Sequence, residues 1–224
     1  MKTAIKSLAL AGIVGAAFAA TPAAAQVAGI ATSSPEAVIV RSKARIAAYQ
    51  QIDTQYAAQM QQVRTLSNEI NTLQQNLDTN KDGQLSEAEV NAGKATVTQI
   101  QQKEQQIGTI TRPMVLAQTY AIEQIINDYN NARQQVIAAK KIQIMLAPDA
   151  IQWAPDAVNV TGDIVAALDT RLPAVSITPP AGWQPRRESY ATQQTVQQIL
   201  LGVAQQQAAQ AAQQQQPAAQ PAGR

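Results

Sequence analysis

Between Val40 and Ile142, single apolar residues recur among long polar stretches with a helical period. In the first half the apolar positions are Tyr49, Ile52, Tyr56, Met60, Val63, Leu66, Ile70, Leu73 and Leu77. Their spacing averages 3.5 residues, which is typical of the narrow seam of a coiled coil. Gln, Asn, Ser, Thr and Ala fill most other positions. The pattern therefore predicts one long helix over residues 41–77 that buries a thin apolar stripe.

The second half continues the helical pattern less regularly. Its apolar positions are Val97, Ile100, Ile107, Met114, Ala121 or Ile122, Ile125, Tyr129, Ala132 and Val136. Gly108 and Pro113 interrupt it, and an internal proline removes a backbone hydrogen bond, so we expect a kink over residues 108–113. Whether this kink is a tolerated bend or a hinge stays open. Together the two halves predict an antiparallel helical hairpin over residues 41–141, a coiled-coil arm.

Short apolar segments flank this arm on both sides. Residues 37–40 and 142–146 read as strands, residues 151–153 as a further short strand, and residues 164–172 as a helix that Pro173 ends. A sheet of two or three short strands is marginal by itself. We therefore expect these pieces to pair with each other, and with the same pieces of other copies, in a small β body made of residues 37–40 and 142–173.

The first 25 residues have the pattern of an export signal. Lys2 and Lys6 precede the apolar run Leu8–Ala20, and Ala23–Ala25 supply small residues for cleavage. The run is too short and too rich in Ala and Gly for a transmembrane anchor. The sequence thus predicts a cleaved, periplasmic protein without stable membrane insertion, whose residues 26–36 form a flexible N-terminus.

Residues 174–224 differ in composition from the rest of the chain. They are rich in Pro, Gln and Ala, which predicts a mostly disordered tail because too little apolar surface is present to offset chain ordering. Thr195–Gln207 is the exception, since its apolar residues share one helical face. We expect this stretch to be ordered only conditionally.

Composition excludes several functions. The chain has neither Cys nor His, which removes Ser-His-Asp and Cys-His triads and His/Cys zinc sites. Without the two signal lysines, the 17 Lys+Arg fall to 15, equal to the 15 Asp+Glu. The net charge near zero gives no support to nucleic-acid binding. We expect no enzymatic activity.

Residues 78–89 fit the twelve-residue EF-hand calcium loop. The expected ligands are Asp78, Asn80, Asp82, the Gln84 backbone carbonyl, Ser86 and Glu89, with Gly83 at the sharp turn. The same residues have a simpler reading, because Ser86 with Glu89 is a helix capping box and Asp-Gly is common in turns. The full oxygen set at alternate positions favours Ca²⁺, bound with modest affinity in a structural role.

This order of parts resembles the OmpH/Skp family of periplasmic chaperones over residues 37–173. The resemblance rests on Val38–Val40, on Ile142–Leu146, and on Asn159–Val165 leading to Leu172-Pro173, with a hairpin of the right length between them. It implies a homotrimer with a β-barrel-like body and three helical arms around a cavity. Unfolded outer-membrane β-barrel proteins would be held there without nucleotide.

The chain departs from that family in its near-neutral charge, its Gln/Ala-rich tail and its EF-hand-type loop. The neutral charge weakens the expectation of an electrostatic grip on acidic clients. A second function therefore stays open, a coiled-coil scaffold or adaptor that docks a partner through the tail, with Trp183, Arg186 and Arg187 or the Ile199–Val203 face as docking elements.

Overall fold

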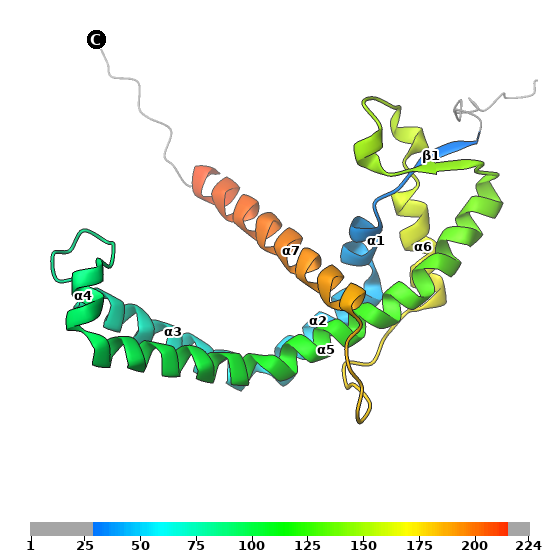
Figure 1. Ribbon diagram of the computed structural model, residues 1–224. Helices are drawn as coiled ribbons and strands as arrows, with labels where there is room; N and C mark the ends of the chain where they lie inside the picture. Colours follow the sequence, from blue (N-terminus) through cyan, green and yellow to red (C-terminus); the bar gives the residue numbers. More distant parts are fainter. Residues whose placement is uncertain (1–28, 215–224) are drawn as a thin grey trace, which may run out of the picture.

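The computed structural model describes residues 29–214, and this part is mainly helical with a small strand component (Figure 1). The elements are β1 (Ile30–Thr32), α1 (Pro35–Arg41), α2 (Lys43–Gln55), α3 (Ala57–Leu77), α4 (Glu87–Ala92), α5 (Lys94–Lys140), β2 (Ile144–Leu146), the 3₁₀ turns η1 (Pro148–Ala150) and η2 (Asp156–Val158), α6 (Thr161–Arg171) and α7 (Arg187–Gln214). The predicted signal peptide, residues 1–25, and the last ten residues of the tail lie outside the described residues.

The two ends of the central region meet in a two-stranded parallel sheet. β1 pairs with β2 from Ile30↔Ile144 to Thr32↔Leu146. Next to it, the backbone N–H of Ser34 donates to the Thr161 hydroxyl oxygen at 3.2 Å. The expected pairing of residues 37–40 with 142–146 is wrong, because residues 30–32 provide the strand that pairs with β2. The predicted flexible N-terminus, residues 26–36, therefore includes β1.

The predicted strand at residues 37–40 is wrong, because this segment is part of α1. The Ser34 hydroxyl oxygen accepts a hydrogen bond from the backbone N–H of Ala37, Pro35 occupies the first turn, and Glu36 adds an acidic group there. These are strong helix-start signals, and they outweigh a four-residue apolar run. The helix still buries Val38, so the segment faces the core as expected.

The predicted strand at residues 151–153 is also wrong. η1 and η2 flank this segment, and Trp153 is 83% exposed. Pro148 and Pro155 fix the backbone at the starts of the two 3₁₀ turns and cannot donate to a sheet. The other two elements of this region are present, with β2 shorter than predicted and α6 starting at Thr161.

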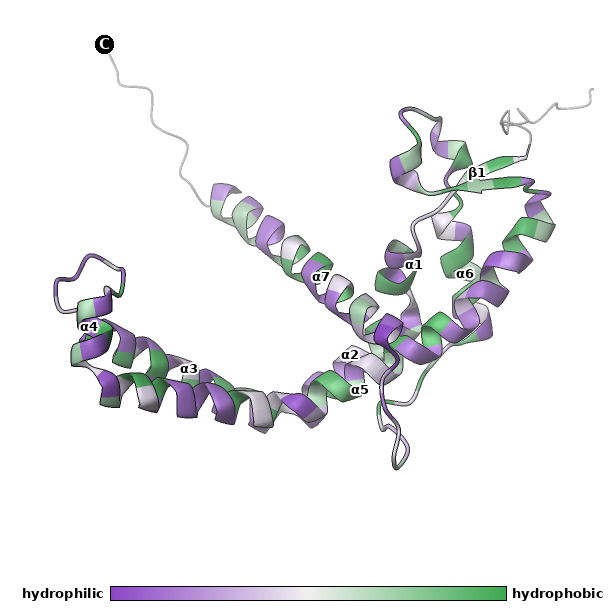
Figure 2. Ribbon diagram, viewed as in Figure 1, coloured by the Kyte–Doolittle hydropathy of each residue, from purple (hydrophilic) through white to green (hydrophobic). Residues whose placement is uncertain are grey.

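The core lies where α5 is surrounded by α1, α6 and the beginning of α7. Its largest side chains with no exposed surface are Val38, Ile122, Ile125, Ile164, Leu168 and Val196. In Figure 2 the hydrophobic positions gather on α1, α6 and the facing part of α5. This cluster and the small sheet form the body.

Away from the body, α3 packs along the first half of α5. The end of α3 and the start of α5 both lie near α4 (Figure 1). Leu77 and Ile100 are buried in the seam between them. The predicted single helix over residues 41–77 is interrupted at Ser42 and at Tyr56, which is not helical (φ −105°, ψ 17°). α5, in contrast, continues through Pro113 and curves in its middle part.

The prediction that residues 174–224 are mostly disordered is wrong for the described part. Residues 187–214 form α7, whose first turns pack on α5 and α1. Ser189 and Val196 are fully buried there, whereas Leu201 is 60% exposed farther along. Tertiary contacts of a few side chains thus order a segment whose composition is unfavourable.

The helices of residues 29–214 include none with the length and hydropathy needed to cross a membrane.

Candidate functional site

The predicted calcium loop lies between α3 and α4, at the end of the helix pair farthest from the body (Figure 1). We use the name distal arm for α3, α4 and the first half of α5, which packs against α3. The sequence explains the position of this loop, because Leu77 is the last apolar residue of the α3 seam and Asp78 begins a polar segment that contains Gly83. Gly83 has φ +79°, a conformation that glycine adopts without steric cost.

Glu89 is the centre of this loop. Its Oε1 accepts hydrogen bonds from the Thr79 backbone N–H at 2.7 Å, the Thr79 hydroxyl at 2.8 Å and the Asn80 backbone N–H at 3.2 Å. Its Oε2 accepts from the Ser86 backbone N–H at 3.0 Å and the Ser86 hydroxyl at 2.7 Å. The bonds from Ser86, then those from Thr79 and Asn80, lower the pKa of Glu89 to about 2.

The other predicted ligands form a second set of contacts. Asp78 accepts from the backbone N–H groups of Asp82 at 3.2 Å and Gly83 at 2.9 Å. Asp82 accepts from the Gln84 backbone N–H at 2.7 Å and from the Asn80 side-chain amide at 2.9 Å. These carboxylate oxygens thus accept hydrogen bonds from the loop's own backbone.

The two hypotheses for residues 78–89 are a helix cap and a calcium loop, and they involve the same side chains. Ser86 and Glu89 form the capping box at the start of α4. Within residues 29–214 no group of three or more acidic side chains has the arrangement of a metal site. The structure brings Glu89 to Ser86 and Asp78 to Asp82, but as hydrogen-bond acceptors for the loop, and calcium binding stays a prediction.

The sides of the distal arm carry shallow apolar features between polar residues. One hollow of about 440 Å³ lies between α3 and α5. It is lined by Thr65, Asn68, Glu69, Thr72, Leu73, Gln99 and Lys103. Such a surface offers one aliphatic side chain among amides, hydroxyls and the Glu69–Lys103 ion pair. It suits weak contacts with an extended polypeptide better than recognition of one compact ligand.

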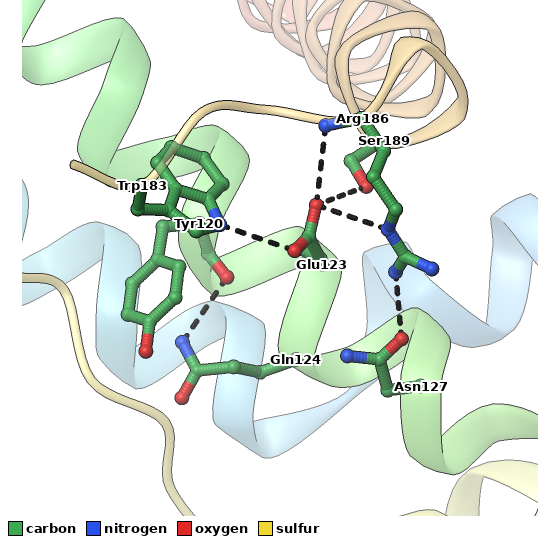
Figure 3. Close-up of polar contacts among 7 residues, drawn as sticks. All are labelled: Tyr120, Glu123, Gln124, Asn127, Trp183, Arg186 and Ser189. Carbon is green, nitrogen blue, oxygen red and sulfur yellow. Dashed lines mark hydrogen bonds and ion pairs between the residues drawn. The ribbon is translucent and has the colours of Figure 1, made fainter. Parts of the chain in front are cut away.

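A cluster that the sequence did not reveal lies on α5, where the tail folds back (Figure 3). The Glu123 carboxylate accepts hydrogen bonds from the Trp183 indole N–H at 3.1 Å, the Ser189 hydroxyl at 2.7 Å and the Arg186 backbone N–H at 3.4 Å. The Arg186 guanidinium adds an ion pair at 3.3 Å. Trp183 also packs edge-on against Tyr120, with ring centroids 5.1 Å apart.

Burial alone would raise the pKa of Glu123, but the hydrogen bonds from Ser189, Trp183 and Arg186 lower it below its usual value. The guanidinium of Arg186 reaches on to the Asn127 side-chain oxygen at 2.6 Å. Trp183 and Arg186, expected as docking elements for a partner, are thus engaged within the chain. A tail Trp close to two Arg residues was the available signal, but nothing in the sequence paired it with Glu123.

The described residues thus form a mainly helical protein with a small body, a distal arm of paired helices, and a C-terminal segment that folds back onto α5. The chain belongs to the family described as outer membrane protein (OmpH-like), which it matches over residues 29–168. The match ends inside α6, so that the segment from Leu172 through α7 lies beyond it.

Among solved structures, the chain is similar to a candidate outer membrane chaperone (OmpH-like) from Caulobacter crescentus. The two are 21% identical, the similarity covers 80% of this chain and 98% of that one, and the TM-score is 0.42. No curated protein matches the chain.

Proposed function

We propose that this protein is a periplasmic, ATP-independent holdase chaperone for unfolded outer-membrane proteins. Membership of the OmpH-like family supports a role of this class. The observation that carries the proposal is the distal arm, a long helix pair with a thin buried seam and sides rich in Gln, Asn and Thr. Such a surface binds many sequences weakly, which a client-holding device requires.

The proposed mechanism needs no energy source. A protein that binds the unfolded form of a client lowers the concentration available for aggregation by mass action. Half-buried apolar residues such as Val63 and Leu73 supply sites for client side chains, and the surrounding amides accept client backbone groups. Because the charge of the mature chain is near zero, apolar and amide contacts rather than ion pairs would hold the client.

We further propose that the body associates into a homotrimer whose arms enclose the client. A two-stranded sheet with open edges is marginal alone and invites pairing with another copy. Apolar side chains of the sheet region are exposed in the single chain, with Ile144 at 52% and Ile30 at 38%. Mass determination with small-angle scattering tests this, because a compact monomer and a trimer with splayed arms differ in both mass and shape.

Aggregation suppression tests the chaperone proposal directly. A denatured outer-membrane β-barrel protein, diluted from urea, should scatter far less light when the protein is present at near-stoichiometric trimer. Leu73→Ser should weaken this protection, and Thr72→Ser, in the same hollow, is the matched control because it leaves the aliphatic contact intact. No suppression at a large excess of protein would refute the proposal.

The loop at residues 78–89 is proposed to bind Ca²⁺ as a clamp at the tip of the distal arm. Six oxygen-bearing positions support this, and hard oxygen ligands are what Ca²⁺ prefers. The ion would have to replace several of the hydrogen bonds to Asp78 and Glu89, which favours modest affinity.

Calcium should raise the melting temperature, and Glu89→Gln should remove the increase. Glu87→Gln is the matched control, since Glu87 is an exposed neighbour at a position that supplies no ligand in the loop pattern. Isothermal titration calorimetry without heat up to millimolar calcium would exclude the site.

The alternative, a scaffold docked through the tail, keeps one supporting observation. The outer part of α7 projects from the body with Leu201 60% and Val203 42% exposed (Figure 1). Leu201→Asp separates the two functions. A scaffold would lose its partner in pull-down experiments from envelope extract, whereas a chaperone would still suppress aggregation.

A further inference from the structure

The segment 176–197, here called the strap, crosses one face of α5 between Gln118 and Asn127. It starts with a pair of hydrogen bonds in which the Gln124 side-chain amide donates to the Ser176 carbonyl at 2.8 Å and accepts from the Ser176 N–H at 3.1 Å. The Glu123 cluster follows (Figure 3). The strap therefore meets α5 through a row of specific polar contacts, which fixes its register.

The helical part of the strap makes the remaining contacts. The Gln118 side-chain oxygen accepts from Gln193 at 3.1 Å and from Gln197 at 2.9 Å. Val196 fills the core between α1 and α5. Of the aliphatic side chains in the described part of α7, it is the one that is fully covered, since Leu200 and Ile199 are only half-buried.

The packing of the strap is incomplete. A cleft of about 340 Å³ lies between α1, α5 and the first turns of α7. Its lining includes Ile39, Tyr129, Glu188 and Thr192. Besides the Glu123 cluster and the Trp183–Tyr120 contact, the strap is held by one fully buried aliphatic side chain and a few amide bonds beside an open cleft. Most of these contacts are polar and individually modest, and they are opposed by the entropy of ordering the segment. The strap is therefore suited to reversible docking.

From Ser189 onward, the strap resembles the sides of the distal arm in being rich in amide side chains with isolated aliphatic residues. From Ser189 to Gln214 the chain contains no charged residue and consists mostly of Gln, Ala and aliphatic residues. Around Val196 the surface beneath the strap is uncharged at Gln118 and Ile122, both buried, whereas Glu123 farther along α5 carries the charge that pairs with Arg186. The uncharged part offers an amide group and an apolar contact, which a polypeptide segment with isolated aliphatic side chains can use.

We infer that the strap is an internal occupant of a binding groove on α1 and α5, and that a segment of an unfolded outer-membrane β-barrel protein displaces it. This inference rests on the proposed chaperone function and adds its regulation. An idle protein covers the groove with its own tail, and client binding replaces this tail with a segment of the client. The groove is a client site additional to the distal arm.

The fluorescence of Trp183 reports whether the strap is docked. It contacts Tyr120 and Glu123 in the docked strap, and the one other tryptophan, Trp153, is exposed in the body. In the full chain with Trp153→Phe, a saturating, tryptophan-free unfolded β-barrel protein should shift the Trp183 emission to the red and increase its quenching by acrylamide. Aggregation suppression is measured in parallel as an independent record of client binding.

Two variants weaken the strap from opposite sides. Glu123→Ala removes the acceptor shared by Trp183, Ser189 and Arg186, and Val196→Asp places a charge in the core contact of α7. Each should shift Trp183 emission without client and bind client about tenfold more tightly, the factor expected for a groove that is otherwise open about a tenth of the time. Asp128→Asn is the matched control, because Asp128 lies on the same helix but pairs with Arg171 of α6.

The outcomes separate the two proposals. Unchanged Trp183 emission at full client binding, or strap variants that bind client no more tightly than the control, would overturn the inference and leave the chaperone function standing. A client that binds none of the variants would refute the chaperone function and, with it, this regulation.

Discussion

The body and the distal arm use the same helix, α5, in two different ways. In the body, α1, α6 and α7 surround α5, and several of its side chains, including Ile122 and Ile125, have no exposed surface. In the distal arm, α3 and the short α4 contact it, and Ile100 is still 9% exposed. One helix can therefore be a core element at one end and half of a thin rod at the other.

This difference implies unequal local stability. Regions with few buried apolar contacts open at lower free energy than the cooperative core. Apart from the strap, the body should unfold only globally, whereas the distal arm should open locally, as the proposed binding of varied clients would require.

Leu168→Ala should destabilise the whole protein. Leu168 is fully buried between α6 and α5, and removing a buried Leu side chain costs about 2–5 kcal/mol of unfolding free energy. Urea unfolding followed by circular dichroism measures the change. Leu201→Ala, at a 60% exposed position, should change the unfolding free energy by less than about 0.5 kcal/mol. Equal effects of the two would contradict the assignment of the core.

Ile70→Ala should have a smaller and local effect. Ile70 is 9% exposed in the seam of the distal arm, where neighbours can relax into the space, so about 2 kcal/mol is expected, the low end for such truncations. Hydrogen exchange should accelerate in α3 and the first half of α5 and stay unchanged in α6. Faster exchange throughout α6 would show that arm and body unfold as one unit.

Acid should loosen the tip of the distal arm before the body. The pKa of Glu89 falls from 4.5 to about 2 in the folded protein, so its contribution to stability is complete above pH 4.5 and is lost as the pH falls from there toward 2. Exchange of the Thr79 and Asn80 amides should accelerate over this range. In Glu89→Gln the same amides should exchange quickly at every pH, and a wild-type profile in this variant would exclude the mechanism.

Lys103→Ala should have the smallest effect. Lys103 pairs with Glu69 across α3 and α5 at 2.5 Å, but both side chains are partly exposed, and such pairs contribute about 0.2–1 kcal/mol. The difference from wild type should disappear in high salt. Lys140→Ala removes a comparable pair with Asp163 in the body. It should lower the free energy of unfolding by a similar small amount, because both pairs are partly exposed to solvent.

The sequence predicted the helical elements best where several signals coincided. The spacing of Ile70, Leu73 and Leu77 located α3, and Ser86 with Glu89 located the start of α4. The loop at residues 78–89 was thereby placed at the tip, and its hydrogen bonds to Glu89 follow from the capping pattern. Whether calcium takes these oxygens depends on energies that the pattern alone does not contain.

The body was harder to predict because its elements are short. Three residues at Ile30–Thr32 carry little strand signal, and they form β1 because β2, far along the chain, supplies the hydrogen bonds. Conversely, residues 37–40 look like a strand by composition, but the capping residue Ser34 and Pro35 make the segment a helix. Short segments follow their partners and caps more than their own propensity.

The spacing of apolar residues was enough to predict the long helices of this protein and the place where they reverse. A polar chain with a thin apolar stripe must form long helices, and a break such as the Asp78–Gly83 segment marks where they reverse. The tertiary structure decided which distant segments meet, above all the return of the tail to Glu123 and the pairing of β1 with β2. Periodicity is a local property that composition and spacing record, whereas a single carboxylate acquires its partners only when the fold brings them together.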